Sequence, residues 1–205
     1  MNGKTMPLFD LTPEISLAKS AATPKTAARL CQVEQKLNSA FGRFEQGHDY
    51  PYCSGAEWST HELIIYMLDQ IGPAHLTACT WSVAEHAAHK LIGLLKARDL
   101  LSINMLVDWR VQVRTPGFMP LAKSEFSRIS VSSCHAKAFV LRNDDWIISC
   151  VTSANFTNNP RIEAGHISTS PAVGQFHERW ITQEIDKAAP FGVDMRKLGK
   201  RDGRA

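Results

Sequence analysis

The feature that most constrains the fold is an alternation of apolar segments between residues 75 and 108. Two segments, HLTACTWSV (75–83) and LLSINMLVD (100–108), have the length and apolar character of buried strands. Between them AEHAAHKLIGLLKARD (84–99) carries apolar residues at helical spacing. Strand, helix and strand joined by short connections form a βαβ unit. The sequence therefore predicts an α/β fold with a mixed, mainly parallel sheet flanked by helices.

Patterns on both sides of this unit predict further elements. Apolar residues recur at spacings of three and four from Ala27 to Phe44, which indicates a helix whose apolar face is buried within the subunit or in a subunit interface. Ser59 and Glu62 have the spacing of a capping box, so a helix is expected over 63–71. Strands are predicted over 127–134, 136–141, 146–153 and 163–169, and a last helix over 174–189.

The length of 205 residues is that of one ordinary domain, and 44% hydrophobic with 21% charged residues excludes a disordered or fibrous chain. Segments 47–58 and 109–126 are rich in turn-forming residues and are expected to be irregular. The predicted divisions are a flexible lead-in over 1–26, an N-terminal helix and loop over 27–58, the main α/β domain over 59–190 and a basic C-terminal tail over 191–205.

Charge and the length of apolar runs bear on location and partners. The net charge is +3, and the tail segment RKLGKRDGRA (196–205) contributes five basic residues and one acidic residue. Such a tail can bind nucleic acid phosphates, although short charged termini are often only solvated. Because no apolar run reaches the roughly 18 residues that cross a bilayer, and residues 1–20 lack a secretory signal, a cytoplasmic location is expected. Reduced thiols are expected at Cys31, Cys53, Cys79, Cys134 and Cys150.

Polar residues stand where two of the predicted strands meet. His135 and Lys137 are two residues apart and would share one face of a strand. A hairpin through RNDD (142–145) would place residues 152–155 beside them. An imidazole, an ammonium group, hydroxyls and a carboxamide suit a phosphoryl group, whose transfer needs a nucleophile, positioning and charge stabilisation.

These residues resemble the signature of the phospholipase D superfamily, H-x-K-x4-D-x6-G-S-x-N. The matching pieces are 135-HAK-137 and 152-TSAN-155, and Glu163 is similar to an acidic residue that often follows in the family. Arg142 stands where the motif has aspartate, and Asp145 takes that position if the hairpin is three residues longer. Thr152 replaces the glycine, so its side chain either narrows the approach to a phosphate or points into the sheet. The resemblance covers residues 135–167.

The resemblance implies a phospholipase D-like domain over 59–190 and a phosphodiesterase, preferably a nuclease, that needs no metal or other cofactor. His135 would attack phosphorus and form a phosphohistidine. The residues implied to hold the phosphoryl oxygens, besides His135, are Lys137, Ser153 and Asn155. Glu163 would orient a histidine, and Asp145 would be structural. His135, Lys137, Asn155 and Glu163 would thus be catalytic.

The resemblance also bears on assembly and partners. The chain has a single His-x-Lys motif, whereas the mechanism uses two histidines, so a homodimer is expected to supply the second cluster. Nucleic acid is the expected substrate, and no membrane partner is expected. Two alternatives remain: a non-catalytic nucleic-acid-binding or scaffold module with a degenerate site, and a phospholipid hydrolase.

Three other features have ordinary structural explanations. A metal could bind Glu85, His86 and His89 at helical spacing, but a solvated helix face explains them better. A zinc site is disfavoured for His48, Cys53 and His61, because no Cys-x2-Cys pair accompanies them. Trp81 at a strand end is expected to be core or pocket wall rather than a base-stacking platform.

Overall fold

The computed structural model describes residues 25–158 and 160–187. Its helices are α1 (Lys25–Phe41), α2 (Thr60–Ile71), α3 (Glu85–Ala97), α4 (Val111–Arg114), α5 (Phe118–Glu125) and α6 (Pro171–Lys187). Its strands are β1 (Asp49–Gly55), β2 (Ala74–Thr80), β3 (Leu100–Asp108), β4 (Arg128–Ser132), β5 (Ala138–Arg142), β6 (Ile147–Thr152) and β7 (Ile162–Ser168). The predicted lead-in and basic tail fall almost wholly outside these residues.

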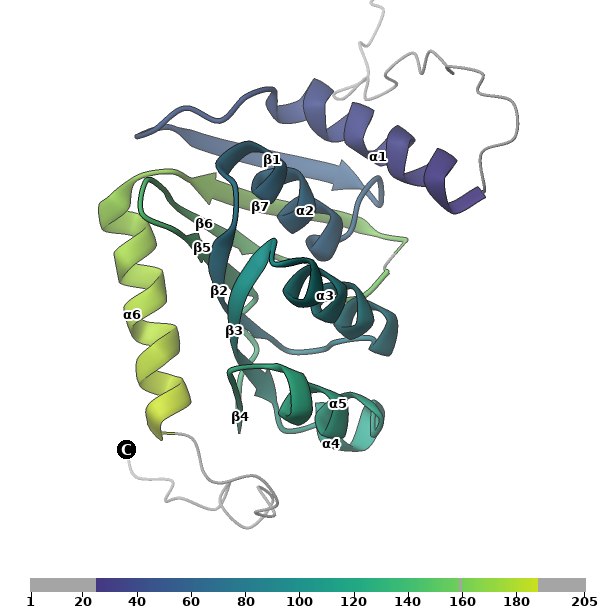
Figure 1. Cartoon of the computed structure of the whole chain (residues 1–205), viewed down its shortest axis with the longest axis vertical. Coiled ribbons are helices and arrows are strands. Elements are labelled where there is room, and N and C mark those ends of the chain that lie inside the picture. The colour runs from purple at the N-terminus through teal and green to yellow at the C-terminus, as the bar shows by residue number, and fades with distance from the viewer. Residues whose placement is uncertain (1–24, 159, 188–205) are drawn as a thin grey trace, which may run out of the picture.

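All seven strands form one sheet in the order β1-β7-β6-β5-β2-β3-β4 (Figure 1). The predicted α/β fold with a mixed sheet and flanking helices is confirmed. The expectation that parallel pairing dominates is wrong, because only β2–β3 and β3–β4 are parallel and the other four ladders are antiparallel. Helices connect neighbouring strands only in the β2-β3-β4 part of the sheet, and short connections such as the β5–β6 turn can join only antiparallel strands.

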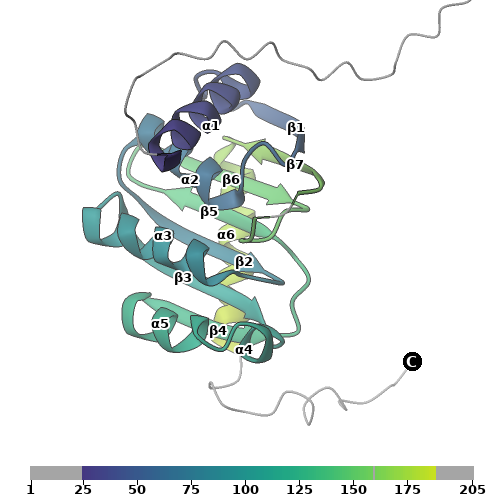
Figure 2. The same cartoon turned by 90° about the vertical axis from the view of Figure 1, so that its right-hand side faces the viewer.

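Helices cover both faces of the sheet. Figures 1 and 2 show α6 alone on one face and the other five helices on the opposite side. Beneath α6 a small apolar cluster joins Cys79 and Leu106 of the sheet to Ile181 and Ile185. The larger core on the other side contains fully buried side chains such as Phe139. Because both faces are covered, every residue of β2 except His75 is buried.

Two segments that were expected to be irregular contain regular structure. Residues 49–55 form the edge strand β1, which pairs with β7, and Pro51 is tolerated there because an edge strand has one unpaired side. The segment 109–126 contains α4 and α5, and Pro120 is accommodated in the first turn of α5. The N-terminal segment therefore shares one sheet with the main domain.

The other local predictions fit the structure closely. Ser59 and Glu62 form the capping box of α2, and Gly72 ends that helix with a φ of 79°. Val33 and Leu37 of α1 are buried, and Tyr66 of α2 donates a hydrogen bond to the carbonyl of Gly42, so α1 packs within the subunit. Within the described part of the chain no helix is long and apolar enough to cross a membrane.

Candidate active site

The predicted site residues gather at one end of the sheet. The carboxyl ends of β2, β3 and β6 meet there, and antiparallel β5 begins at the same place. The backbone amide of Thr152 donates to the carbonyl of Lys137 at 3.0 Å, which continues the β5–β6 ladder by one residue. The hairpin thus brings the segment after β6 beside the segment before β5, as the sequence predicts.

His135 and Lys137 are in direct contact, although they lie in an irregular segment before β5 and not in a strand. Lys137 Nζ lies 3.5 Å from each ring nitrogen of His135 and donates to the His135 carbonyl at 2.8 Å. The His135 ring is exposed, and its centroid lies 5.6 Å from that of Trp81. A cation and a solvent-accessible imidazole are therefore presented together, with an indole as a wall.

Asn155 is oriented by the end of β2. Its Oδ1 lies 3.2 Å from the Thr80 hydroxyl and accepts a hydrogen bond from the backbone amide of Ser82 at 3.1 Å. The Thr60 hydroxyl donates to its backbone carbonyl. No described residue accepts a hydrogen bond from its Nδ2, so the amide end of this side chain can serve an anionic ligand. Thr80 and Ser82, which hold Asn155, flank Trp81 in sequence. Because the Trp81 ring neighbours the His135 ring, Asn155 is held next to the His135 cluster.

Ser153 and Glu163 form a second pair at this end of the sheet. The Ser153 hydroxyl donates to Glu163 Oε2 and accepts from the backbone amide of Ala164 at 3.0 Å. Glu163 comes from β7, in register with Ser54 of β1. The distant strand β7 therefore supplies a carboxylate that holds the Ser153 hydroxyl.

The structure decides between the two alternatives for Thr152. This side chain is buried, and its hydroxyl accepts hydrogen bonds from Tyr52 at 2.9 Å and from the amide of Ala154 at 3.1 Å. Burial is the main reason that the pKa of Tyr52 is raised, so its hydroxyl remains a donor. Gly165 makes this contact possible, because a Cβ there would lie 2.6 Å from the Tyr52 ring. Thr152 thus points into the sheet.

The hairpin turn does not use Asp145 as the sequence suggests. Asp145 is exposed, and no hydrogen bond or ion pair joins its carboxylate to another residue of the described chain. Asn143 has the structural role: its Nδ2 donates to the carbonyls of Ile71 and Pro73. Its Oδ1 accepts from the amides of Asp145 and Trp146. Asn143, and not Asp145, therefore fastens the turn to the end of α2.

Comparison with solved structures supplies the fold family. Nuc from Salmonella typhimurium, a phospholipase D family member, is similar with a TM-score of 0.54 and 16% identity over 69% of this chain and 97% of that chain. The chain has a phospholipase D-like fold. NucT from Helicobacter pylori is similar with a TM-score of 0.55 and 9% identity, over 70% of this chain and 99% of that chain.

A third similar structure is TrmBL2, an archaeal chromatin protein with a novel mode of DNA binding. It has a TM-score of 0.50 and 10% identity, over 80% of this chain and 62% of that chain. No protein-family model matches the sequence, and no curated protein matches it. At these identities the likeness shows the phospholipase D-like fold alone.

Several residues around the candidate site were missed by sequence reasoning. Asp108 at the end of β3 is fully buried and binds Arg110 through both carboxylate oxygens, at 2.6 and 3.2 Å. Arg110 and Arg114 lie over Trp81, with their Cζ atoms 5.2 and 4.7 Å from the ring centroid. The signal available in the sequence was the i, i+4 spacing of the two arginines.

The alternative metal ligands have other partners in this fold. Among residues 25–158 and 160–187 no group of three or more His, Cys, Asp or Glu side chains has the geometry of a metal site. His89 lies 3.9 Å from Glu85 on the surface of α3. His61 and His86 make an edge-to-face ring contact at 5.6 Å.

The described cysteines Cys53, Cys79, Cys134 and Cys150 are free thiols. Cys79 and Cys134 lie together under α6. A hydrogen bond from the Cys79 thiol lowers the pKa of Cys134, the residue before His135.

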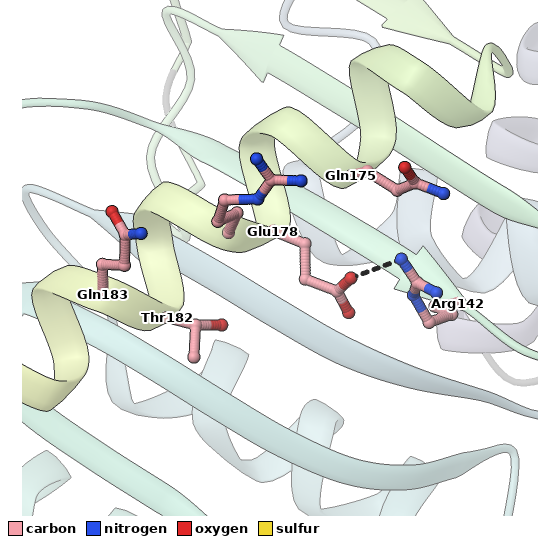
Figure 3. Close-up of a pocket in the computed structure, with 6 residues that line it drawn as sticks. Arg142, Gln175, Glu178, Thr182 and Gln183 are labelled. Carbon is pink, nitrogen blue, oxygen red and sulfur yellow. Dashed lines mark ion pairs between the residues drawn. The ribbon is translucent and has the colours of Figure 1, made fainter.

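A polar pocket lies elsewhere, between α6 and the far end of β5 (Figure 3). Its volume is about 390 Å³, and an ion pair between Arg142 and Glu178 at 2.6 Å crosses it. Its lining residues are Arg142, Gln175, Glu178, Arg179, Thr182 and Gln183. Because Lys137 precedes β5 and Arg142 is its last residue, this pocket lies at the opposite end of the strand from His135.

Proposed function

We propose that this protein is a metal-independent phosphodiesterase, most specifically a nuclease, that acts through a phosphohistidine intermediate. The observation that carries the proposal is the contact of Lys137 with the exposed ring of His135 beside the anchored Asn155. A nucleophilic ring nitrogen, a fixed cation and an oriented amide donor are what a phosphoryl group requires during transfer. The phospholipase D-like fold supports this proposal by analogy.

In the proposed reaction a ring nitrogen of His135 attacks phosphorus, and the bond to the leaving oxygen breaks. A second histidine donates its proton to that oxygen, so the product leaves as an alcohol. The same histidine then takes a proton from water, which attacks the phosphohistidine and releases the phosphate monoester and a free His135. Lys137, Asn155 and the Ser153 hydroxyl held by Glu163 would bind the non-bridging oxygens.

The second histidine would be His135 of a partner copy. The chain contains a single His-x-Lys motif, and the exposure of His135 leaves its ring accessible to another subunit. Two copies related by a twofold axis would place two such clusters around one phosphate. The lysine pair would then provide positive charge at the phosphate that a metal ion would otherwise supply.

Nucleic acid is the preferred substrate class. TrmBL2, which shares the fold, is described as binding DNA. Arg114, which is exposed and lies over Trp81, adds positive charge next to the site. Phosphates dominate the affinity of proteins for nucleic acids, so exposed cations beside a phosphodiesterase site favour a polynucleotide.

The test is hydrolysis of bis-p-nitrophenyl phosphate and of labelled DNA in excess chelator, by the wild type and by His135→Ala. We expect the wild type to remain active and His135→Ala to lose roughly 10³-fold or more. His75→Ala is the matched control, because His75 is also exposed but is the second residue of β2, at the other end of the sheet.

Loss of wild-type activity in chelator with recovery on adding zinc or magnesium would overturn the mechanism. DNA binding without hydrolysis would instead show a non-catalytic module. Hydrolysis of phosphatidylcholine vesicles but not of DNA would show a phospholipase.

A further inference from the structure

Four side chains surround the indole of Trp81 at the end of β2. Lys137 Nζ lies 5.8 Å from the ring centroid, and the Arg110 and Arg114 Cζ atoms lie 5.2 and 4.7 Å from it. The His135 ring centroid is 5.6 Å away. All three cations therefore lie within 6 Å of one ring, and Arg114 shares this ring as a neighbour with His135 and Lys137.

The two arginines differ in how their charge is balanced. Arg110 is bound by the buried Asp108 carboxylate, and that hydrogen bond is the main reason that the pKa of Arg110 is raised. Arg114 is exposed, and in the described part of the chain no carboxylate forms an ion pair with it. Its positive charge is therefore available to a ligand, whereas that of Arg110 is compensated.

The position of Arg114 is fixed by the local fold. It ends α4, and its backbone amide donates to the carbonyl of Arg110 at 2.9 Å, so the two guanidinium groups lie one helical turn apart. Thr115 then anchors the chain, because its hydroxyl donates to the carbonyl of Val83. A guanidinium held on an indole face loses little further freedom when it binds an anion.

We propose that Arg114, held on Trp81, binds a phosphate next to the one being cleaved, so that the preferred substrate is a nucleic acid strand and not an isolated diester. This inference rests on the proposed function. Phosphates of one strand recur about every 3.4 Å of helix axis, so a strand whose scissile phosphate meets Lys137 passes further phosphates across Trp81. Arginine suits that contact because its planar fork can bind two phosphate oxygens at once.

The experiment compares Arg114→Ala and Arg114→Lys with the wild type on two substrates, a short fluorescein-labelled oligothymidylate and bis-p-nitrophenyl phosphate. Arg114→Ala should lower kcat/KM for the oligonucleotide about tenfold or more, chiefly through KM. The decrease for the one-phosphate diester should be several-fold smaller. Arg114→Lys should recover part of the loss, because it keeps the charge but not the fork.

The matched control is Lys96→Ala, which removes one exposed positive charge in the last turn of α3, at the opposite end of the sheet. We expect Lys96→Ala to have the same effect on kcat/KM for the oligonucleotide and for the diester. Arg114 is exposed, so its loss should leave the melting temperature nearly unchanged. Equal decreases on both substrates for Arg114→Ala would overturn the inference.

A binding measurement separates this inference from the proposed function. In a His135→Ala background, the affinity for the oligothymidylate is measured against salt concentration with and without Arg114→Ala. Loss of one phosphate contact should reduce the slope of log K against log salt by about 0.7 for a single strand. An unchanged slope would reject the Arg114 contact even if the enzyme is active. A reduced slope would support the Arg114 contact. If the wild type then hydrolyses neither substrate, the contact stands and the proposed nuclease activity is rejected.

Discussion

The carboxylate of Asp108 accepts a hydrogen bond from the backbone amide of Cys134 at 3.2 Å. The end of β3 is thereby fastened to the residue that precedes His135. The same carboxylate binds Arg110, and Arg110 lies over the ring of Trp81, which neighbours the His135 ring. The buried Asp108 side chain therefore holds the backbone before His135 and also the Arg110 guanidinium beside Trp81. Asp108 is best described as a positioning residue, because its carboxylate is buried.

We expect Asp108→Asn to lower kcat more than it changes KM. The amide can still accept one hydrogen bond, but it brings a buried NH2 group and leaves Arg110 without its counter-charge. The free energy of unfolding should fall by about 1–3 kcal/mol. Asp186→Asn serves as the control, because Asp186 is an exposed partner of Arg128 whose loss should cost less than about 1 kcal/mol. A loss of stability with unchanged kcat would show that Asp108 acts only in the fold.

Asn155→Asp should separate the anchoring and binding ends of this side chain. The retained oxygen still accepts from Ser82, so stability should change by less than about 1 kcal/mol. The second oxygen replaces the amide donor with a negative charge, which repels a phosphate. We expect kcat/KM to fall roughly 10²–10³-fold, the usual cost of losing one such donor.

Asn155→Ala supplies the comparison for this prediction. It loses the donor and leaves the Ser82 amide with only its longer hydrogen bond to the Thr80 hydroxyl at 3.4 Å, so it should lose activity and about 1–3 kcal/mol of stability together. Full activity in Asn155→Asp would remove the amide donor from the proposed mechanism.

The sequence predicted the hairpin well because the hairpin is local. His135, Lys137 and Asn155 lie on the two segments that a short turn brings together, so their meeting follows from strand pairing alone. The motif predicted a structural role for Asp145 but gives only spacing, so it could not show that Asn143 is the side chain that reaches the carbonyls of Ile71 and Pro73.

Long-range pairings explain most of what the sequence could not predict. Strand β1 contains proline and glycine, and it is a strand because β7 pairs with it from more than a hundred residues away. The contact of Tyr52 with Thr152 depends on that pairing and on the missing side chain of Gly165. The positions of the two arginines over Trp81 likewise depend on α4. This helix is a single turn, too short for its sequence to show a helical periodicity.

Gly165→Ala tests the packing of Tyr52 against β7. The new Cβ would lie 2.6 Å from the Tyr52 ring, so the ring must move away from the Thr152 hydroxyl. We expect a loss of about 1–3 kcal/mol, or roughly 2–4 °C in melting temperature for each kcal/mol. Gly55→Ala is a matched control on the neighbouring strand, because nothing lies within 4 Å of its Cβ position. Equal melting temperatures for the two variants would contradict the close approach.

In the proposed homodimer the two subunits share one reaction site. If each reaction needs His135 from both subunits, a heterodimer of wild type and His135→Ala is inactive, because its one site lacks either the nucleophile or the proton donor. After equal amounts of the two proteins have exchanged subunits, activity per wild-type chain should fall to about one half, and total activity to about one quarter of an all-wild-type sample. Exchange is verified by energy transfer between labelled subunits, and His75→Ala in place of His135→Ala should leave the total near its unmixed value. If complete exchange leaves activity per wild-type chain unchanged, each subunit carries its own proton donor, and His61, His86 and His166 become the residues to test.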